Sequence, residues 1–314
     1  MSGLLASGLS DFLRDAVEPQ VQVDAIGQGA IYALMAVGIG LVFGVLRLVN
    51  FAYGQLIMAG AFALAFASDQ DWPVWAGIVL CFAVVLALSL AMDRLVFRPL
   101  RTQSAATMLI ATFAVAFFLQ AVALLIDQRD DTLGEPAASL AELNRPWEVW
   151  GTDVRKITVV AILVAAACLV ALVLFLGRTR TGLQMRAAAM DFQTARLLGV
   201  RANRVIGSAV LLSGILAAIV AVMLTVQQPL VTSTFALRET IVVLAGVVIG
   251  GMTRLVSATL GGFLIGYLSG VLGGALPSEL SQYLNAYLFG VVILILLVRP
   301  NGLFTRGGGP VERV

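Results

Sequence analysis

The chain offers few of the residue types that carry covalent or metal chemistry. It contains no histidine and two cysteines, Cys81 and Cys168, each of which stands within an apolar stretch. The missing histidine excludes Ser-His catalysis, zinc sites that need histidine and histidine proton relays. We interpret the two cysteines as small packed hydrophobic side chains rather than as a disulfide or a metal site. The sequence therefore predicts no catalytic residue and no metal site.

Nucleotide binding and ion coupling are also not expected of this chain. Lys156 is its single lysine, and no GxxxxGK[ST] phosphate loop occurs. Charged residues stand at the ends of apolar segments, as Arg238 and Glu239 do, whereas ion-coupled carriers usually place such groups within their spans. We therefore expect no cofactor on this chain, so that either a partner uses ATP or transport is passive.

One long polar segment, residues 178–204, has a single dominant sign of charge. It contains one acid, Asp191, and six arginines: Arg178, Arg180, Arg186, Arg196, Arg201 and Arg204. Positive charge between two apolar segments stays on the cytoplasmic side of a membrane. This segment therefore predicts the orientation of the whole chain.

The same segment has the pattern of two short surface helices. Within 183–198, one helical face gathers apolar and small residues, namely Ala187, Met190, Thr194, Leu197 and Leu198. Asp191 is a candidate N-cap that divides the stretch, and Gly199 is a candidate stop. Such an element can transmit force to a cytoplasmic protein. The alternative is a solvated arginine-rich loop that only sets the topology.

The composition requires elements that cross a membrane. Of the 314 residues, 60% are hydrophobic and 12% are charged, and the mean hydropathy is +0.98, far above that of an ordinary soluble domain. The lipid bilayer is therefore an expected partner. The net charge of +2 reflects arginines in the loops between spans, so nucleic acid is not an expected partner.

Nine apolar segments have about the length that a membrane-spanning helix needs. They are residues 25–46, 51–67, 74–97, 105–126, 157–177, 206–226, 239–251, 256–275 and 283–298. The seventh is short, which suits a tilted or re-entrant segment or one that continues into the eighth. The expected fold is an all-α polytopic membrane protein with about eight or nine transmembrane helices and a cytoplasmic coupling-helix loop.

The distribution of charge divides the chain into regions. We interpret residues 1–24 as an amphipathic lead-in helix, 25–298 as the transmembrane domain and 299–314 as a cytoplasmic tail. Within the domain, the basic loop 178–205 is expected on the cytoplasmic side and the acidic loop 127–156 on the outer side. The N-terminus then lies outside and the C-terminus inside, if all nine segments cross.

Four glycines recur every four residues in the eighth segment, at Gly262, Gly266, Gly270 and Gly274. This spacing puts them near one helix face, where the missing side chains let a neighbouring backbone approach closely. We favour helix packing as their role over the lining of a transport pathway.

Several motifs, in order along residues 25–304, resemble those of the permease subunits of branched-chain amino acid ABC importers, of the LivH type. GLVFGVLRLVNFAYGQLIMAGAF, which starts at Gly40, is similar to the family's N-terminal signature, and DRLVFRPLR at 93–101 to its arginine-proline loop. RAAAMDFQTARLLGVRANRVI at 186–206 is similar to the cytoplasmic coupling segment, and VRPNGLF at 298–304 to the closing motif.

The resemblance implies a multi-pass permease of the bacterial inner membrane that pairs with a second, related permease subunit. Two cytoplasmic ATPase subunits would use ATP and dock on the coupling segment, and a periplasmic solute-binding protein would deliver the solute. The coupling residues that it implies are Arg186, Asp191, Arg196, Leu198 and Gly199. In this interpretation the chain is a transport subunit without its own ATPase site.

The candidate pathway residues are Asn50, Tyr53 and Gln55. The family commonly shows a histidine and an acid where this chain has Tyr53 and Gln55, and an acid where it has Met190. Hydrogen bonding between helices is the alternative role for Asn50 and Gln55. The solute is a branched-chain or related amino acid, or alternatively urea or a short amide. A stand-alone secondary carrier or channel is the alternative mechanism.

Overall fold

The computed structural model describes residues 14–47, 49–100, 103–127, 146–149, 152–252, 254–300 and 302–304. Each of the nine predicted apolar segments overlaps one long α-helix. These helices are α2 (Pro19–Leu46), α3 (Tyr53–Asp69), α4 (Val74–Met92), α6 (Ala105–Asp127), α8 (Lys156–Arg178), α11 (Ala202–Gln227), α12 (Leu237–Gly250), α13 (Leu255–Ala275) and α15 (Leu284–Val298). The predicted helical class is therefore confirmed for this part of the chain.

Six of the helical segments in the described ranges are long and apolar enough to cross a membrane, fewer than the eight or nine crossings predicted. They are Pro19–Leu46, Val74–Leu100, Ala106–Ile126, Lys156–Arg178, Asn203–Gln227 and Leu255–Ala275. The 14 residues of α12 rise only about 21 Å at about 1.5 Å per residue, less than the roughly 30 Å hydrocarbon core. Since residues 228–236 before α12 are not helical, this short helix starts inside the bundle.

Helix α2 lies at the centre of the bundle and packs against α13, α11, α8 and α12. Its apolar residues are distributed around the whole helix, as expected of a helix covered on every side. Proline is favoured in the first turn of a helix, and α2 starts at Pro19. Residues 19–24 therefore belong to α2 rather than to the predicted lead-in, whose residues 1–13 lie outside the described part of the chain.

The four glycines of α13 lie against α2. A Cβ atom at position 266 would lie 2.7 Å from the Tyr32 Cβ, and one at position 274 would lie 2.8 Å from the Val21 side chain. Added Cβ atoms at positions 262 and 270 would overlap Ala36 and the backbone of Ala25. The fourfold glycine spacing thus matches the turns of α2, and the missing side chains bring the two helices close together.

Replacing Gly270 by alanine should lower the stability of the bundle. The added methyl group would meet the Cα atom of Ala25, which is backbone and cannot rotate away. Overpacking of this kind typically lowers the free energy of unfolding by about 1–3 kcal/mol. Thermal unfolding of the purified chain measures the effect. Gly177→Ala in α8 is the matched control, because no described atom outside its own helix turn lies within 4 Å of the added Cβ. An equal loss of stability in both variants would contradict the packing role.

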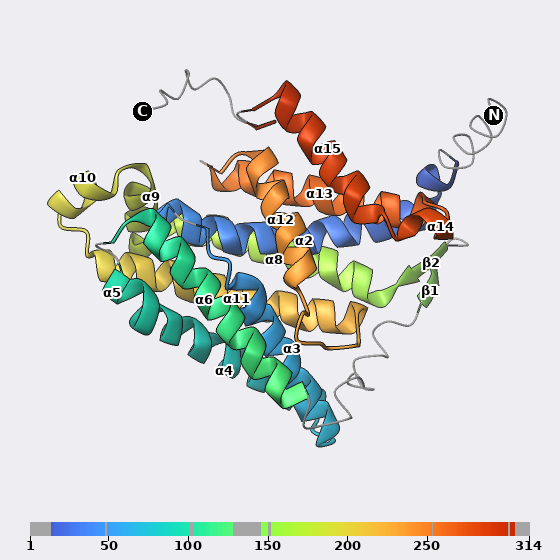
Figure 1. The fold of residues 1–314 in the computed structure, drawn as a ribbon, viewed down its shortest axis with the longest axis horizontal. Coiled ribbons are helices and arrows are strands. Elements are labelled where there is room, and N and C mark those ends of the chain that lie inside the picture. The colour runs from blue at the N-terminus through green and yellow to red at the C-terminus, as the bar shows by residue number, and fades with distance from the viewer. Residues whose placement is uncertain are drawn as a thin grey trace.

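Figure 1 shows the charged and polar connections at two ends of the bundle. The short helices α5 (Arg98–Leu100), α9 (Arg180–Met190) and α10 (Phe192–Leu197) lie at one end. The strands β1 (Pro146–Val149) and β2 (Thr152–Arg155) and the helix α14 (Ser278–Ser281) lie at the other. The two loops lie at opposite ends of the bundle, and which end faces the cytoplasm stays a prediction from the charges.

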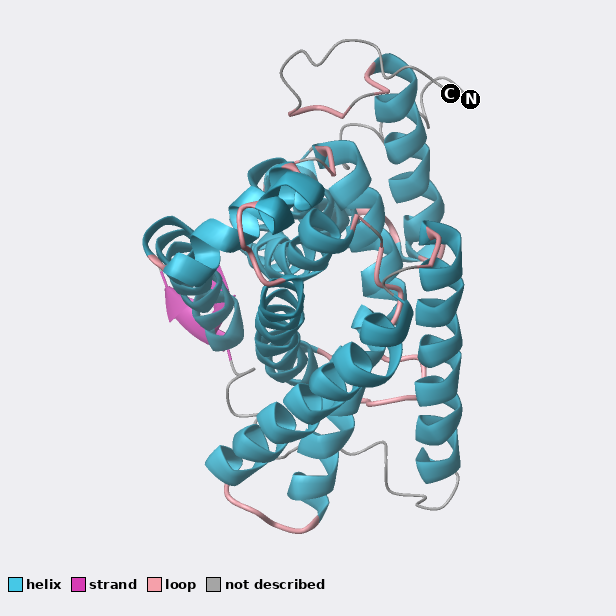
Figure 2. Cartoon of the chain, turned by 90° about the vertical axis from the view of Figure 1, so that its left-hand side faces the viewer, coloured by secondary structure: helices cyan, strands magenta, loops and turns pink. Residues whose placement is uncertain are grey.

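The strands β1 and β2 pair antiparallel, with Trp147 opposite Val154. They form a short hairpin at the edge of the helices, as Figure 2 shows. The fold prediction did not include this sheet within the loop 127–156. Tryptophan, valine and threonine favour extended structure, which accounts for it locally. Residues 128–145 and 150–151 of the same loop lie outside the described part of the chain.

A π-helical turn, η1 (Asp93–Phe97), joins α4 to α5. The Arg98 Nε atom donates to the Asp93 carboxylate at 3.0 Å, and the Arg98 backbone N–H bonds the Asp93 carbonyl. A π-turn places residues five apart on the same side, so this ion pair fits the local helix type. Asp93 is buried there, which gives it a structural role at the C-terminal end of α4.

Candidate functional site

The coupling segment starts with a sharp corner between α8 and α9. The Thr179 hydroxyl accepts a hydrogen bond from the Gly182 backbone N–H at 3.0 Å, which caps α9. The same hydroxyl donates to the Phe175 carbonyl at 2.7 Å, which ties the cap to the last turn of α8. A Cβ atom at Gly182 would overlap the Phe175 carbonyl and Leu176 backbone. The direction of α9 is therefore fixed by the end of a membrane-spanning helix.

Asp191 separates α9 from α10. It has an extended backbone conformation, and its carboxylate accepts hydrogen bonds from the Thr194 backbone N–H at 3.1 Å and from the Thr194 hydroxyl. This is the geometry of an N-cap, as the sequence predicts for this position. After α10, Gly199 has φ +86°, a left-handed conformation that ends the helix and favours glycine. The structure thus contains both predicted boundaries.

The two short helices bury one face and expose another. Met185, Ala188 and Ala195 are buried against the bundle. The exposed face combines the arginines Arg186 and Arg196 with large apolar side chains. Those side chains have high exposed fractions: Leu183 60%, Met190 85%, Leu197 88% and Leu198 81%. An apolar surface of this kind, rimmed by polar residues at the end of a membrane bundle, is typical of a protein-binding site.

Arg47 connects the coupling segment to the centre of the bundle. Its guanidinium donates a hydrogen bond to the Ala189 carbonyl in the last turn of α9, where a positive charge also interacts favourably with the helix dipole. Arg47 itself ends α2 with φ 56°, a left-handed conformation. A small cavity of about 90 Å³ lies between the C-terminal end of α2, α9 and the start of α13. The charge pattern of the sequence carries no signal for this contact, which joins residues 142 apart.

The three candidate pathway residues lie together at the start of α3, and all three are buried. The Asn50 side chain accepts a hydrogen bond from the Ala52 backbone N–H at 3.1 Å, which shapes the turn before α3. Within the described part of the chain, the Tyr53 hydroxyl and the Gln55 Oε1 atom have no hydrogen-bond partner. A buried polar group without a partner costs about 1–3 kcal/mol, so these two atoms are unusual.

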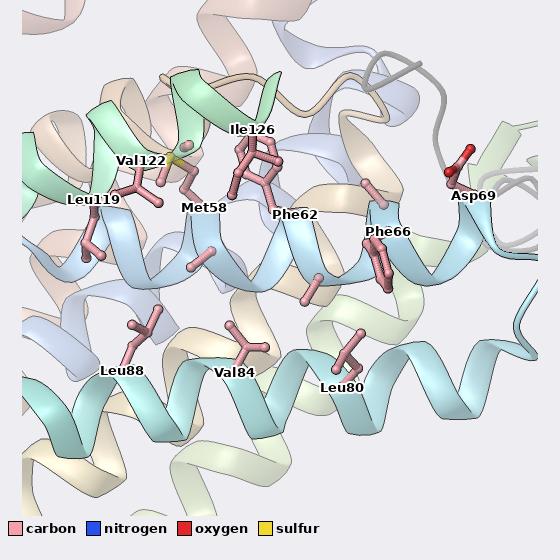
Figure 3. A pocket seen from close by; sticks show the side chains of 14 residues that line it. Met58, Phe62, Phe66, Asp69, Leu80, Val84, Leu88, Leu119, Val122 and Ile126 are labelled. Carbon is pink, nitrogen blue, oxygen red and sulfur yellow. The ribbon is translucent and has the colours of Figure 1, made fainter. Parts of the chain in front are cut away.

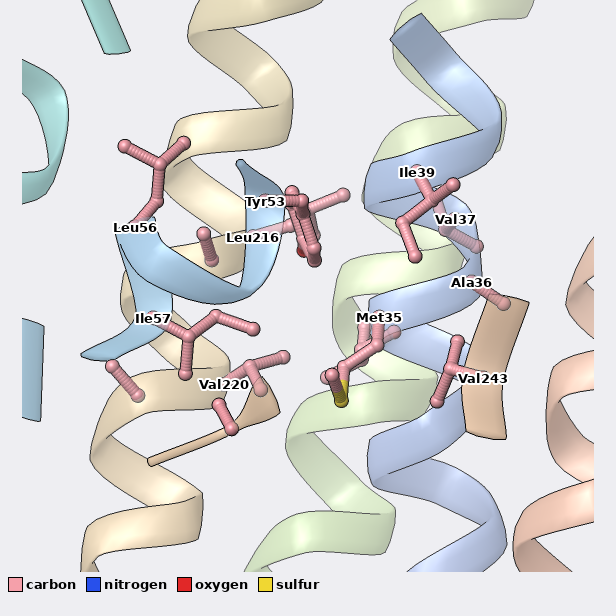
Figure 4. Packing of buried hydrophobic residues seen from close by; sticks show 14 of the residues in the cluster. Met35, Ala36, Val37, Ile39, Tyr53, Leu56, Ile57, Leu216, Val220 and Val243 are labelled. Carbon is pink, nitrogen blue, oxygen red and sulfur yellow. The ribbon is translucent and has the colours of Figure 1, made fainter. Parts of the chain in front are cut away.

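Tyr53 is fully buried between α3 and α2, as Figure 4 shows. Its ring and hydroxyl lie directly against Gly38, where any added Cβ would overlap them. On α2, the carbonyl of the same glycine accepts a hydrogen bond from the Ser213 hydroxyl of α11 at 2.8 Å. Three helices therefore meet at Gly38. In this conformation the Tyr53 side chain is enclosed by protein and lines no described cavity.

An apolar groove of about 420 Å³ lies between α3, α4 and α6 (Figure 3). Met58 and Phe62 of α3 face Val84 of α4 and Val122 of α6 there. Asp69, the last residue of α3, is the one charged residue that lines the groove. With almost no polar group to orient a hydrophilic solute, this groove fits hydrocarbon rather than a transported polar molecule.

The structure thus brings the predicted residues together in two places. Arg186, Asp191, Arg196, Leu198 and Gly199 share the exposed coupling segment at one end. Asn50, Tyr53 and Gln55 share the buried start of α3, and the hydrogen bond from Arg47 links the two regions. Glu239, which was predicted to stand at a span end, is buried in the first turn of α12 because that helix starts inside the bundle.

Residues 22–298 match the family described as branched-chain amino acid transport system, permease component. BraD of Pseudomonas aeruginosa, a high-affinity branched-chain amino acid transport system permease protein, is 28% identical over 91% of this chain and 95% of its own length. LivH of Escherichia coli, with the same description, is 26% identical over 91% of this chain and 95% of its own length. A probable branched-chain amino acid transport permease protein LivH of Methanocaldococcus jannaschii is 25% identical over 81% of this chain and 80% of its own length.

Two solved structures share the fold. PsaBC from Streptococcus pneumoniae in complex with a Fab has a TM-score of 0.51 at 12% identity and covers 93% of this chain and 97% of its own. An inward-facing conformation of a putative metal-chelate type ABC transporter has a TM-score of 0.50 at 17% identity and covers 93% of this chain and 99% of its own. At these identities the similarity establishes the arrangement of the helices alone.

Proposed function

Because this chain belongs to the family of permease components of branched-chain amino acid transport systems, we propose that it moves branched-chain or related amino acids across the bacterial inner membrane as part of an ATP-driven importer. It is a multi-pass membrane protein and a permease component rather than an ATPase. Its proposed partners are a second related permease subunit, two cytoplasmic ATPase subunits and a periplasmic solute-binding protein.

The exposed face of α9 and α10 carries this proposal. Leu197 and Leu198 leave most of their surface uncovered on an element that the bundle holds rigidly from its other face. Apolar side chains in the centre of an interface supply most of its binding energy, and surrounding arginines add charge complementarity. An ATPase subunit that covers this face would satisfy both features. A loop that only sets topology would need neither the caps nor the apolar surface.

The contacts suggest how movement of an ATPase would reach the centre of the bundle. Displacement of α9 would pull on Arg47 through its bond to the Ala189 carbonyl, and Arg47 is the turn between α2 and α3. The small cavity beside α9 gives this helix space to shift. The start of α3, with Asn50, Tyr53 and Gln55, would then change position relative to α2. ATP would drive the cycle because the ATPases bind nucleotide more tightly in one of the two states.

The alternatives differ in solute and in the source of energy. Urea or a short amide would use the same importer class, and neutral Tyr53 and Gln55 could hydrogen-bond such a solute. A stand-alone carrier or channel would work without an ATPase. The exposed apolar face of the coupling segment argues against the stand-alone reading, since such a carrier needs no protein at that surface.

Reconstitution tests the proposal. The chain, its second permease subunit, the ATPases and the solute-binding protein should together take up radiolabelled leucine into proteoliposomes when ATP is supplied. Uptake should stop when the ATPases carry a substitution that prevents hydrolysis. Uptake of urea and acetamide, measured in parallel, distinguishes the solute classes. Equal leucine uptake by the permease subunits without any ATPase would refute the importer mechanism.

A further inference from the structure

A second cavity, of about 340 Å³, lies at the outer end of the bundle and differs in kind from the apolar groove. It is formed between α2, α8, α13, the end of α11, the end of β2 and the starts of α12 and α15. Four charged side chains line it: Asp24, Arg155, Arg238 and Glu239. Its volume is within the range of about 300–1,000 Å³ that is usual for small-molecule sites.

The opposite charges in this cavity are held apart. None of the four forms an ion pair with another of the four, and the one ion pair found among the described residues joins Asp93 to Arg98. The Arg238 Nε atom instead donates to the Asn285 side chain at 3.1 Å. The Asp24 carboxylate accepts from the Thr158 hydroxyl at 3.3 Å. Neutral partners therefore position the charges without neutralising them.

Glu239 is the most enclosed of the four, with 8% of its surface exposed. Its carboxylate accepts a hydrogen bond from the Gln228 amide at 3.1 Å. Burial of a carboxylate is costly, and a neutral amide offsets only part of the cost, whereas a cation would offset much more. Tyr32, Gln28 and Ser269 add polar side chains to the lining. The site is thus arranged for a ligand that brings a positive charge.

We propose that this outer cavity binds a small zwitterionic solute through separate sites for its ammonium and carboxylate groups. Glu239 receives the ammonium, and the Arg238 guanidinium receives the carboxylate. Ile157, Val242 and Leu284 also line the cavity and offer contacts for an aliphatic side chain. Since both charges of the solute are matched, neither is left without a partner when the solute leaves water, and the buried Glu239 carboxylate gains a cationic partner.

This inference rests on the proposed function, because the cavity lies at the end where a solute from outside would enter. It adds that the permease itself recognises the zwitterion, rather than relying only on the protein that delivers it. A solute without one of the two charged groups would bind poorly there. Urea and short amides, which carry neither charge, would be excluded from the site.

The test measures binding of tritiated leucine to the assembled transporter, without solute-binding protein, in competition with three unlabelled compounds. They are leucine, leucinamide, which lacks the carboxylate, and 4-methylpentanoate, which lacks the ammonium. Wild-type transporter should bind leucine about 10- to 100-fold more tightly than either analogue. Arg238→Gln should bind leucine and leucinamide about equally. Glu239→Gln should bind leucine and 4-methylpentanoate about equally.

Arg254→Gln is the matched control, because it removes an arginine charge at the other end of α13, outside the cavity lining. It should retain the preference for leucine over leucinamide. Absence of leucine binding in the wild type, or unchanged preferences in both charge variants, would overturn the proposal. The same preparations are also tested for ATP-driven leucine uptake with solute-binding protein present. Failure of the importer function would appear as no uptake in this second assay, which distinguishes it from failure of the cavity to bind leucine.

Discussion

Replacing Leu197 and Leu198 together by glutamate should abolish ATPase association and transport while leaving the permease folded. Both side chains are more than four-fifths exposed, so the substitution removes no packing within the bundle. Burying one leucine contributes about 1.5–3 kcal/mol, so the loss of two should weaken association about a hundredfold or more. Co-purification of the ATPases with the tagged permease, and leucine uptake by membranes of equal permease content, measure the two effects.

Conservative replacement supplies the control. Leu197→Met with Leu198→Met keeps the apolar surface and should retain association close to that of the wild type. If the glutamate variant still captured the ATPases normally, the exposed leucines would not lie in the interface. The segment would then be the solvated loop that the arginine content alone allows.

The boundaries of the coupling segment could be predicted because they depend on local interactions. The Asp191 carboxylate caps the residues that directly follow it, and Gly199 supplies a backbone conformation that other residues adopt at a cost. Neither feature needs information about distant parts of the chain. The helical segments could be predicted for a similar reason, since a run of apolar residues in a membrane must satisfy its own backbone hydrogen bonds.

The outer cavity could not be predicted, because its residues come from six helices and the strand β2. Arg238 and Glu239 stand next to a hydrophobic segment in the sequence, which favours a position at a membrane surface. The structure starts α12 inside the bundle, and Glu239 is therefore buried beside Gln228. In the sequence, the unusually short segment 239–251 is the feature that could indicate such a site, because interrupted hydrophobic segments often supply binding sites in transporters.

The role of Arg47 also depends on a contact between distant parts of the chain, since Ala189 follows it by 142 residues. Sequence reasoning assigned such arginines to topology, because positive charges collect on the cytoplasmic side. A topological charge requires no particular partner. The bond to α9 gives Arg47 a second role, as the contact between the docking element and the turn that precedes α3.

Arg47→Gly should therefore separate ATP hydrolysis from transport. The variant removes the guanidinium bond to α9, and charge-assisted hydrogen bonds contribute about 1.5–3 kcal/mol. Glycine also adopts the left-handed conformation of residue 47 without strain, which offsets part of the lost bond, so the variant should still fold. We expect normal ATPase association and continued ATP hydrolysis, with leucine uptake reduced about tenfold or more.

Arg47→Lys distinguishes a specific bond from a general need for positive charge. Lysine keeps the charge and one donor group, so uptake should fall between the values of the wild type and the glycine variant. Thermal unfolding of all three proteins excludes a loss of fold as the cause. Normal uptake by Arg47→Gly would show that force reaches the bundle by another route, such as the corner between α8 and α9 at Thr179 and Gly182.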